Sequence, residues 1–196
     1  TVILQSAIND FGYLIIAGHG TARKLNSFCM MPAGTIGLAL STFVSQNKGA
    51  NQQQRIRDGV RYGNLIACAW GALITVILFF GAPLLVQLIS GSREPTVIDN
   101  ATLYLRINAP FYAVLGILLN LRNSLQGLGM KIIPLVSSVI ECLGKIVFVA
   151  LFIPVLHYFG VIICEPVIWC CMCLQLAWSF YHNPYIKGAK NNQETV

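Results

Sequence analysis

Two long stretches without charge, joined by a basic connector, constrain the fold more than any other feature of this sequence. No Asp, Glu, Lys or Arg occurs in residues 25–46 or in residues 62–91. Each stretch is long enough to cross the roughly 30 Å hydrocarbon core of a bilayer as a helix, which takes about 20 residues. Residues 45–61 carry one acid and four cations: Asp58, Lys48, Arg55, Arg57 and Arg61. The pattern predicts a helical hairpin in a membrane, with its basic connector on the cytoplasmic side.

The composition excludes an ordinary soluble domain and argues against a nucleic-acid-binding protein. Of the 196 residues, 56% are hydrophobic and only 10% are charged, so the chain lacks the polar residues to cover a soluble core of this size. The net charge is +6, but the cations lie in short connectors between apolar runs and form no continuous basic face. We therefore expect a lipid bilayer as the partner, and no nucleic acid.

Apolar segments recur along the chain and predict an all-α, polytopic membrane protein, a bundle of six transmembrane helices within residues 1–182. A short connector at residues 19–24 follows the first segment. After the last segment, we expect residues 183–196 to form a polar, frayed cytoplasmic tail. The predicted spans are residues 1–18, 25–46, 64–90, 97–123, 132–157 and 161–181.

The connectors on the two sides of the predicted membrane differ in charge. One side holds three cations: Arg23, Lys24 and Arg93. The connectors after the second and fourth spans, together with the tail, hold eight: Lys48, Arg55, Arg57, Arg61, Arg122, Lys131, Lys187 and Lys190. Because short cytoplasmic loops are enriched in Lys and Arg, this difference predicts that both chain ends lie in the cytoplasm, at a cell (inner or plasma) membrane. It also agrees with an even number of spans.

No pattern of catalytic or metal-binding residues stands out. The seven cysteines follow no zinc-binding spacing, and several lie in an apolar run near Cys170, where cysteine usually serves as a small hydrophobic residue. No nucleophile–base pair or phosphate-binding glycine loop is evident. We therefore expect neither an enzyme nor a metal site nor a cofactor. The chain begins with Thr1 and not with Met, so we expect a piece of a longer polypeptide.

The fourth predicted span carries a stripe of polar and small residues. These recur every three or four positions, the spacing of one helix face: Asn108, Tyr112, Gly116, Asn120 and Asn123. Polar residues on a helix inside a membrane face protein or water and not lipid. The stripe is therefore a candidate lining for a substrate or ion pathway.

The first, fifth and sixth predicted spans each contain one acid. Asp10 is the only acid of the first segment, and it is either a proton or Na⁺ ligand or a packing carboxylate that is hydrogen-bonded to its neighbours. Glu141 and Lys145 are four residues apart and can neutralise each other, as a structural or a gating ion pair. Glu165 precedes Pro166, and we expect it near the outer membrane interface.

The second span and the basic connector carry a Pro, small residues, then Gln-Asn-x-Gly-Ala and an Arg, here Pro32, residues 46–50 and Arg55. This pattern resembles the multidrug and toxic compound extrusion (MATE) family. Further residues fit the same family in the same order: Phe11 and Gly12 with Ala17, residues 125–129 with Pro134, Glu141 near Lys145, Gly160 and Trp169. The ordered set covers nearly the whole chain.

The resemblance implies twelve helices in two six-helix lobes, of which this chain is the C-terminal lobe. Gln5 stands where some family members have a cation-binding Glu. Gln5 and Asn9 lie one helical turn apart and offer carbonyl oxygens to a substrate or an ion, but a neutral amide takes up no proton. Those members also have an Asp on helix ten. The fourth span of this chain offers Asn108, Tyr112, Asn120 and Asn123 there, and no carboxylate within its core.

The function implied is a secondary active antiporter that exports drug-like or organic cationic compounds in exchange for H⁺ or Na⁺, by rocking of two lobes. One alternative is a lipid-linked oligosaccharide flippase of related architecture, which favours a more cationic cavity. Another is an inactive membrane-embedded fragment or scaffold, because six helices form only one wall of a cavity. The opposite wall is expected from the missing N-terminal lobe, in the same polypeptide, or from a second copy of this chain.

Overall fold

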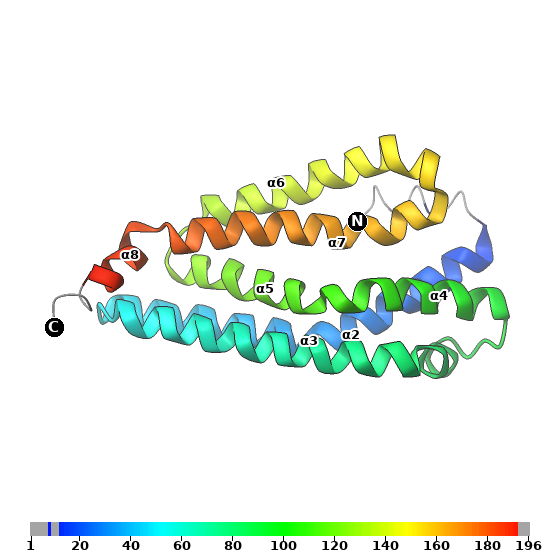
Figure 1. Cartoon of the computed structure of the whole chain (residues 1–196), viewed down its shortest axis with the longest axis horizontal. Coiled ribbons are helices and arrows are strands. Elements are labelled where there is room, and N and C mark those ends of the chain that lie inside the picture. The colour runs from blue at the N-terminus through cyan, green and yellow to red at the C-terminus, as the bar shows by residue number, and fades with distance from the viewer. Residues whose placement is uncertain (1–7, 9–11, 192–196) are drawn as a thin grey trace.

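The computed structural model describes Ile8 and residues 12–191, which form a bundle of helices without any strand in these residues (Figure 1). The predicted all-α class is confirmed. The elements are α2 (Tyr13–Gly49), α3 (Gln53–Ser90), α4 (Pro95–Asn108), the 3₁₀ turn η1 (Ala109–Phe111), α5 (Tyr112–Gly127), α6 (Ile132–Val147), the π-helical turn η2 (Phe148–Phe152), α7 (Ile153–Tyr181) and α8 (Pro184–Asn191).

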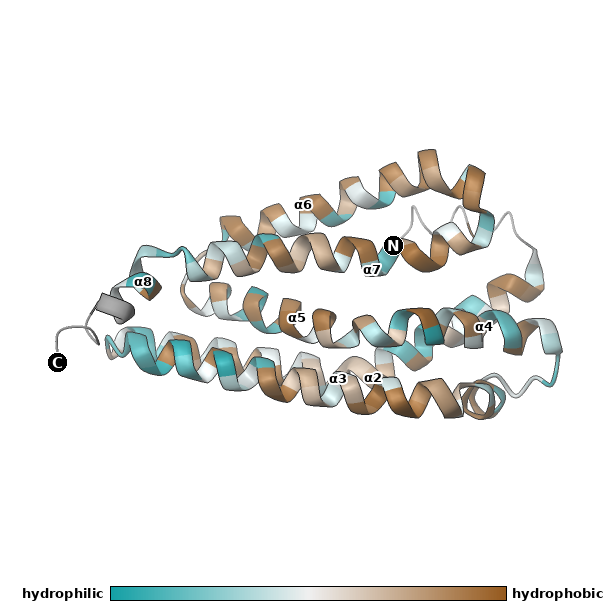
Figure 2. Cartoon of the chain, viewed as in Figure 1, coloured by the Kyte–Doolittle hydropathy of each residue, from teal (hydrophilic) through white to brown (hydrophobic). Residues whose placement is uncertain are grey.

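The outer surface of the bundle is apolar, as a protein surrounded by lipid requires. Large apolar side chains point outward, among them Phe80 at 79% exposure, Val155 at 74% and Leu88 at 71%. Hydrophobic residues follow the outer sides of α3 and α6 for much of their length (Figure 2). A helix satisfies its own backbone hydrogen bonds, so it can meet hydrocarbon on such a face. Four described helical segments are long and apolar enough to cross a membrane: Tyr13–Gly49, Gln53–Ser90, Pro95–Gly127 and Ile132–Tyr181. The chain is therefore a multi-pass membrane bundle.

The last of these segments is bent back on itself. His157 has φ 49° and ψ −136°, which is not helical, and the π-helical turn η2 lies just before it. As a result, α6 and α7 lie side by side (Figure 1). The bend falls where the predicted fifth span (132–157) gives way to the sixth (161–181). The predicted first span, residues 1–18, lies mostly outside the described residues.

Residues 19–24 are helical, which differs from the connector that the sequence suggested. They lie within α2, and no proline interrupts the chain between Tyr13 and this region. Gly18 does not mark a turn but a close helix contact, because a Cβ atom there would lie 2.8 Å from the carbonyl oxygen of Val97 in α4. The His19 and Arg23 side chains are thus carried on a helix that packs inside the bundle.

The basic connector is also shorter than expected. The α2 helix continues to Gly49 and α3 begins at Gln53, so that the arginines of this region lie in the first turns of α3. Lys48 Nζ donates a hydrogen bond of 2.6 Å to the carbonyl oxygen of Leu128 in the α5–α6 turn. This contact joins two connectors at the same end of the bundle.

A break between α4 and α5 is stabilised by α3. Pro110 lacks an N–H group and lies in the η1 turn, which interrupts the helix. Thr75 Oγ1 of α3 donates a 2.7 Å hydrogen bond to the carbonyl oxygen of Ala109. One turn earlier in α3, a Cβ atom on Gly71 would lie 2.6 Å from the backbone nitrogen of Ala113. The missing side chain lets the two backbones approach closely.

Part of the expected frayed tail is an ordered helix, α8. Asn183 Oδ1 accepts a 2.9 Å hydrogen bond from the backbone N–H of Tyr185, as a capping residue does, and Pro184 follows it. Ile186 is buried, and the Tyr185 hydroxyl donates to the carbonyl oxygen of Lys48 at 3.4 Å. The helix therefore packs on the connector between α2 and α3.

Candidate functional site

A buried carboxylate lies where α2, α4 and α7 meet. Glu165 of α7 is 7% exposed and accepts a hydrogen bond of 2.6 Å from the Tyr104 hydroxyl of α4. Arg23 Nη1 of α2 lies 3.9 Å from the other carboxylate oxygen. The Arg23 side chain is 31% exposed, so it connects the buried acid with the surface of the lobe. We call the group formed by His19, Arg23, Tyr104, Asn108 and Glu165 the polar cluster.

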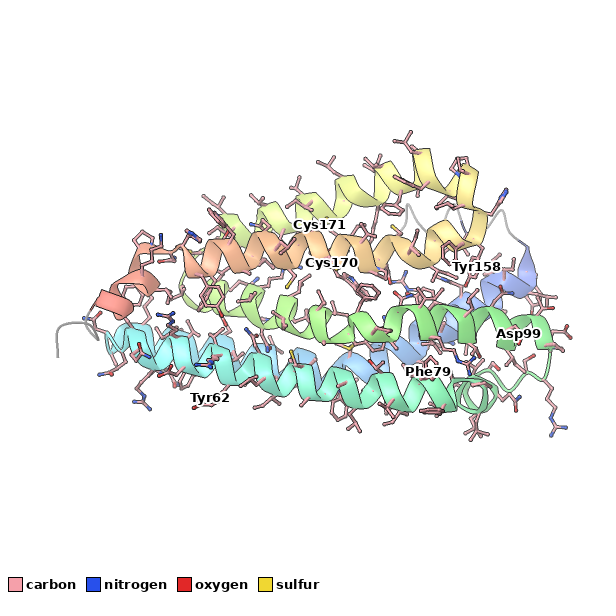
Figure 3. The ribbon with its side chains drawn as sticks, viewed as in Figure 1. Tyr62, Phe79, Asp99, Tyr158, Cys170 and Cys171 are labelled. Atoms are coloured by element: carbon pink, nitrogen blue, oxygen red, sulfur yellow. The ribbon has the colours of Figure 1, made fainter. Side chains whose placement is uncertain are left out.

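His19 closes the polar cluster on the α2 side. Its ring packs edge-on against Tyr104 with 5.1 Å between the ring centres, and against Tyr158 with 6.1 Å. His19 Nδ1 lies 3.4 Å from the Tyr158 hydroxyl, while its Nε2 is buried without a hydrogen-bond partner among the described residues. Tyr158 lies at the start of α7 (Figure 3).

Asn108 extends the polar cluster along α4. Its Nδ2 donates to the carbonyl oxygens of Tyr104, at 2.9 Å, and Ile162, at 3.3 Å. Its Oδ1 is buried without a hydrogen-bond partner within the described part of the chain, and so is Thr102 Oγ1. Because buried polar atoms in folded proteins nearly always have partners, these two atoms leave hydrogen-bonding capacity unused among the described residues.

The chemistry open to this arrangement is acid–base and ionic. It offers one carboxylate, one guanidinium group, phenol and imidazole groups, and a free amide oxygen. In the described residues, no group of three or more His, Cys, Asp or Glu side chains is placed to hold a metal ion. A charged group inside a membrane is costly, and such groups are typically found along ion and substrate pathways.

The sequence of this chain matches one known protein family over most of its length. The MatE family model matches residues 1–151. The chain belongs to the MatE family.

Curated relatives agree with this assignment. The chain is 24% identical over 149 residues to "Probable multidrug resistance protein YoeA" of Bacillus subtilis, which covers 76% of this chain and 32% of that protein. It is 23% identical over 125 residues to "Probable multidrug resistance protein NorM" of Thermotoga maritima, covering 64% of this chain and 26% of that protein. The matching part of this chain therefore spans about a third or less of the length of these curated relatives.

Solved structures show the same fold. A MOP superfamily transporter from Pyrococcus furiosus superposes with a TM-score of 0.81 at 12% identity, covering 94% of this chain and 41% of that one. A MATE crystallised in complex with MaD3S superposes with a TM-score of 0.81 at 13% identity, covering 94% and 42%. This MatE chain thus has the fold of about two fifths of each of these solved structures.

The structure brings only part of the predicted pathway into the polar cluster. Asn108 belongs to it. Tyr112 is buried one turn further on, with its ring 6.4 Å from that of Trp169 and its hydroxyl without a described partner. Asn120 lies two turns beyond Tyr112, outside the polar cluster. Its Nδ2 donates a 3.2 Å hydrogen bond to Asn64 Oδ1 of α3. The predicted stripe of this MatE chain is therefore buried between helices from Asn108 to Asn120, and Asn123 at its end is partly exposed.

The remaining predicted residues lie elsewhere. Lys145 Nζ and Glu141 Oε1 form an ion pair of 2.6 Å on α6, with the lysine buried and the carboxylate partly exposed. The structure shows this pair without placing it in the polar cluster. Gln5, Asn9 and Asp10 lie outside the described residues.

Sequence reasoning missed four members of the polar cluster: His19, Arg23, Tyr104 and Glu165. Glu165 is buried in the bundle, and its predicted place near the outer membrane interface stays a prediction. One signal was available, because Glu165 is the sole charged residue in the 29 residues of α7. Its partners on α2 and α4 are distant in sequence, and no local pattern indicates them.

Proposed function

We propose that this chain is the C-terminal lobe of a MATE-type secondary active antiporter, which exports drug-like or organic cationic compounds in exchange for H⁺ or Na⁺. Family membership and the printed names of the relatives, which describe multidrug resistance proteins, support the transport role. Membership of a transporter family also supports a role other than enzymatic catalysis.

The observation that carries the proposal is the buried carboxylate of Glu165. A carboxylate that is 7% exposed, in a helix with no other charge, is retained at a cost unless a proton or a cation uses it. Its neighbours Tyr104 and Arg23 come from two other helices. A change in the charge of Glu165 therefore acts on three helices together, which ion-coupled movement of a lobe requires.

One lobe provides one wall of a central cavity. In alternating-access transporters, the site is formed between two repeats and opens to each side as one repeat rocks against the other. The solved structures are more than twice as long as this chain's matching part. The proposed partner is thus the N-terminal lobe in the same polypeptide, or a second copy of this chain.

The size of the purified chain distinguishes these arrangements. The 196-residue chain is extracted in mild detergent, and its mass is measured by size-exclusion chromatography with light scattering. A homodimer supports a cavity rebuilt from two copies, and a monomer supports a lobe that needs its N-terminal counterpart.

Transport is tested with the full-length parent protein in lipid vesicles. A fluorescent organic cation such as ethidium is loaded, and its efflux is followed with a pH gradient, a Na⁺ gradient, or neither. The proposal predicts efflux that rises with one of the two gradients and returns to the basal rate when an ionophore collapses that gradient. Equal efflux under all three conditions would contradict ion coupling.

A further inference from the structure

We propose that Glu165 is the proton-binding group of this lobe and that Arg23 is its built-in counter-ion, so that the lobe is coupled to H⁺ and not to Na⁺. This inference rests on the proposed antiport function and names its coupling ion and residue.

The first step is that Glu165 is the best candidate for a buried proton-binding group among the described acids. The structure describes five acidic residues: Asp58, Glu94, Asp99, Glu141 and Glu165. Of these five, only Glu165 is buried. Asp58, Glu94 and Asp99 lie near the ends of their helices. Glu141 already has a buried cation, Lys145, at 2.6 Å. A site that takes up a proton inside the described bundle therefore centres on Glu165.

The second step concerns the partners of Glu165, which are hydrogen-bond donors. Tyr104 donates its hydroxyl proton at 2.6 Å, and the Arg23 guanidinium group lies at 3.9 Å. Sodium, as a hard cation, needs several oxygen ligands around it. The positive charge of Arg23 opposes the binding of Na⁺ and of H⁺ alike, so the two ions differ here in the ligands that they need. A proton needs only one oxygen lone pair, so it fits where Na⁺ does not.

The third step is the consequence of protonation. When H⁺ binds, the carboxylate becomes a neutral carboxyl group, and its attraction to Arg23 is lost. The proton comes from the water on one side of the membrane and leaves to the water on the other, and no covalent bond other than the O–H bond changes. Arg23 is 31% exposed, so its guanidinium group can turn outward once it is released. The charged link between α2 and α7 is thus present in one protonation state and absent in the other.

Other titratable groups lie on the helices around Glu165, and α5, which packs on α7, contributes Tyr112. His19 and Arg23 lie on α2, Tyr104 on α4 and Tyr158 on α7. Lys145 lies on α6, which also packs on α7, and it is paired with Glu141 at 2.6 Å. Tyr104 and Tyr158 are neutral at ordinary pH, which leaves Arg23 as the cation in contact with the carboxylate.

The test uses the full-length parent protein in vesicles and two variants. Glu165→Gln keeps the size of the side chain and removes its titration. Asp99→Asn is the matched control, because Asp99 is an exposed acid near the outer end of α4 (Figure 3). We expect Glu165→Gln to lower efflux driven by a pH gradient by at least about tenfold, the scale of a typical coupling between sites. Exchange of labelled for unlabelled substrate without a gradient should persist, and Asp99→Asn should leave both rates unchanged.

A spectroscopic measurement reports protonation without transport. In infrared difference spectra between two pH values, the carbonyl band of a buried protonated carboxyl group is expected in the wild type and in Asp99→Asn, and absent in Glu165→Gln. Arg23→Gln should keep this band and still lower the efflux driven by a pH gradient, because protonation then releases no ion pair.

Three results would overturn the inference. They are pH-driven efflux that persists in Glu165→Gln, a carboxyl band that survives in this variant, and wild-type efflux that follows a Na⁺ gradient but not a pH gradient. The last result needs no variant, so the inference stays testable if Glu165→Gln fails to fold. Wild-type efflux that ignores both gradients contradicts the antiport proposal itself, which separates the two failures.

Discussion

At the scale of single residues, the contact between Tyr104 and Glu165 is the shortest link across the polar cluster. The hydroxyl of Tyr104 is buried and donates to the carboxylate at 2.6 Å, a distance typical of a hydrogen bond to an ionised acceptor. Neither group can turn to water if the other is removed. The pair therefore contributes to holding α4 against α7.

Replacing Tyr104 tests this contribution. Tyr104→Phe keeps the ring and removes the donor, so we expect the free energy of unfolding to fall by about 1.5–3 kcal/mol, the usual range for a hydrogen bond to a charged group. The measurement is the unfolding midpoint in detergent, followed by fluorescence-detected size-exclusion chromatography. Tyr62→Phe is the control, because Tyr62 is exposed on α3 (Figure 3). Equal midpoints for the two variants would show that the hydroxyl of Tyr104 adds nothing to stability.

The sequence predicted one member of the polar cluster and missed the others for a physical reason. The spacing of polar residues on one helix face identified Asn108 because helix periodicity is a local property. Glu165 of α7 and Arg23 of α2 approach each other only in the folded bundle, where α4 packs on both helices, and 142 positions separate them in the sequence. A single sequence contains no local pattern that indicates a contact between two residues so far apart.

At the scale of helices, close packing of α3 on α5 depends on a missing side chain. A Cβ atom on Gly71 would lie 2.6 Å from the Ala113 backbone nitrogen, and the backbone cannot move aside as a side chain can. On the same helix, a Cβ atom on Gly81 would have only Leu85 near it, at 3.9 Å. The two glycines thus differ in packing and not in secondary structure.

This difference predicts opposite effects of the same substitution. Gly71→Ala forces α3 and α5 apart and should lower the free energy of unfolding by about 1–3 kcal/mol, as overpacking does. Gly81→Ala should be neutral or stabilising by up to about 1 kcal/mol, because alanine favours a helix more than glycine. Both are measured by the thermal midpoint in the same detergent. A Gly71→Ala variant as stable as Gly81→Ala would refute the close contact.

The α8 helix makes a second prediction about an element. Asn183→Ala removes the cap, which should cost about 0.5–2 kcal/mol of helix stability. Hydrogen–deuterium exchange of the α8 amides should then become faster. Lys187→Ala is the control, because Lys187 is exposed on the same helix. Unchanged exchange in Asn183→Ala would mean that packing of Ile186 alone holds α8 in place.

Hydrophobicity predicted the membrane helices but not their full length. Apolar runs indicate the part of a helix that meets lipid, whereas α2 and α3 continue beyond it into polar residues. The capping pair Asn183 and Pro184 was a readable signal for α8, but its polar surroundings suggested a frayed tail.

At the scale of the whole molecule, the connectors divide between two ends. The α2–α3 connector, the α5–α6 turn and α8 lie at one end, and the α3–α4 connector lies at the other (Figure 1). Hydrophilic residues gather where α3 begins, beside α8 (Figure 2). The positive-inside rule supports the proposal that this end, which carries α8, faces the cytoplasm.

Cysteine labelling tests this orientation. Gln52→Cys lies between α2 and α3, and Ser92→Cys lies between α3 and α4. In intact cells, a membrane-impermeant maleimide should label Ser92→Cys well above the parent protein and leave Gln52→Cys at the parent level until the cells are opened. The reverse pattern would place the basic end outside.

The hydrogen bond of 2.6 Å from Lys48 to Leu128 and the seating of Tyr185 on Lys48 have a mechanical consequence. These hydrogen bonds join the α2–α3 connector, the α5–α6 turn and α8 to one another. We therefore expect this end of the bundle to be rigid. We expect movements within the bundle to occur mainly in its other half, where Arg23 of α2 lies beside Glu165 of α7.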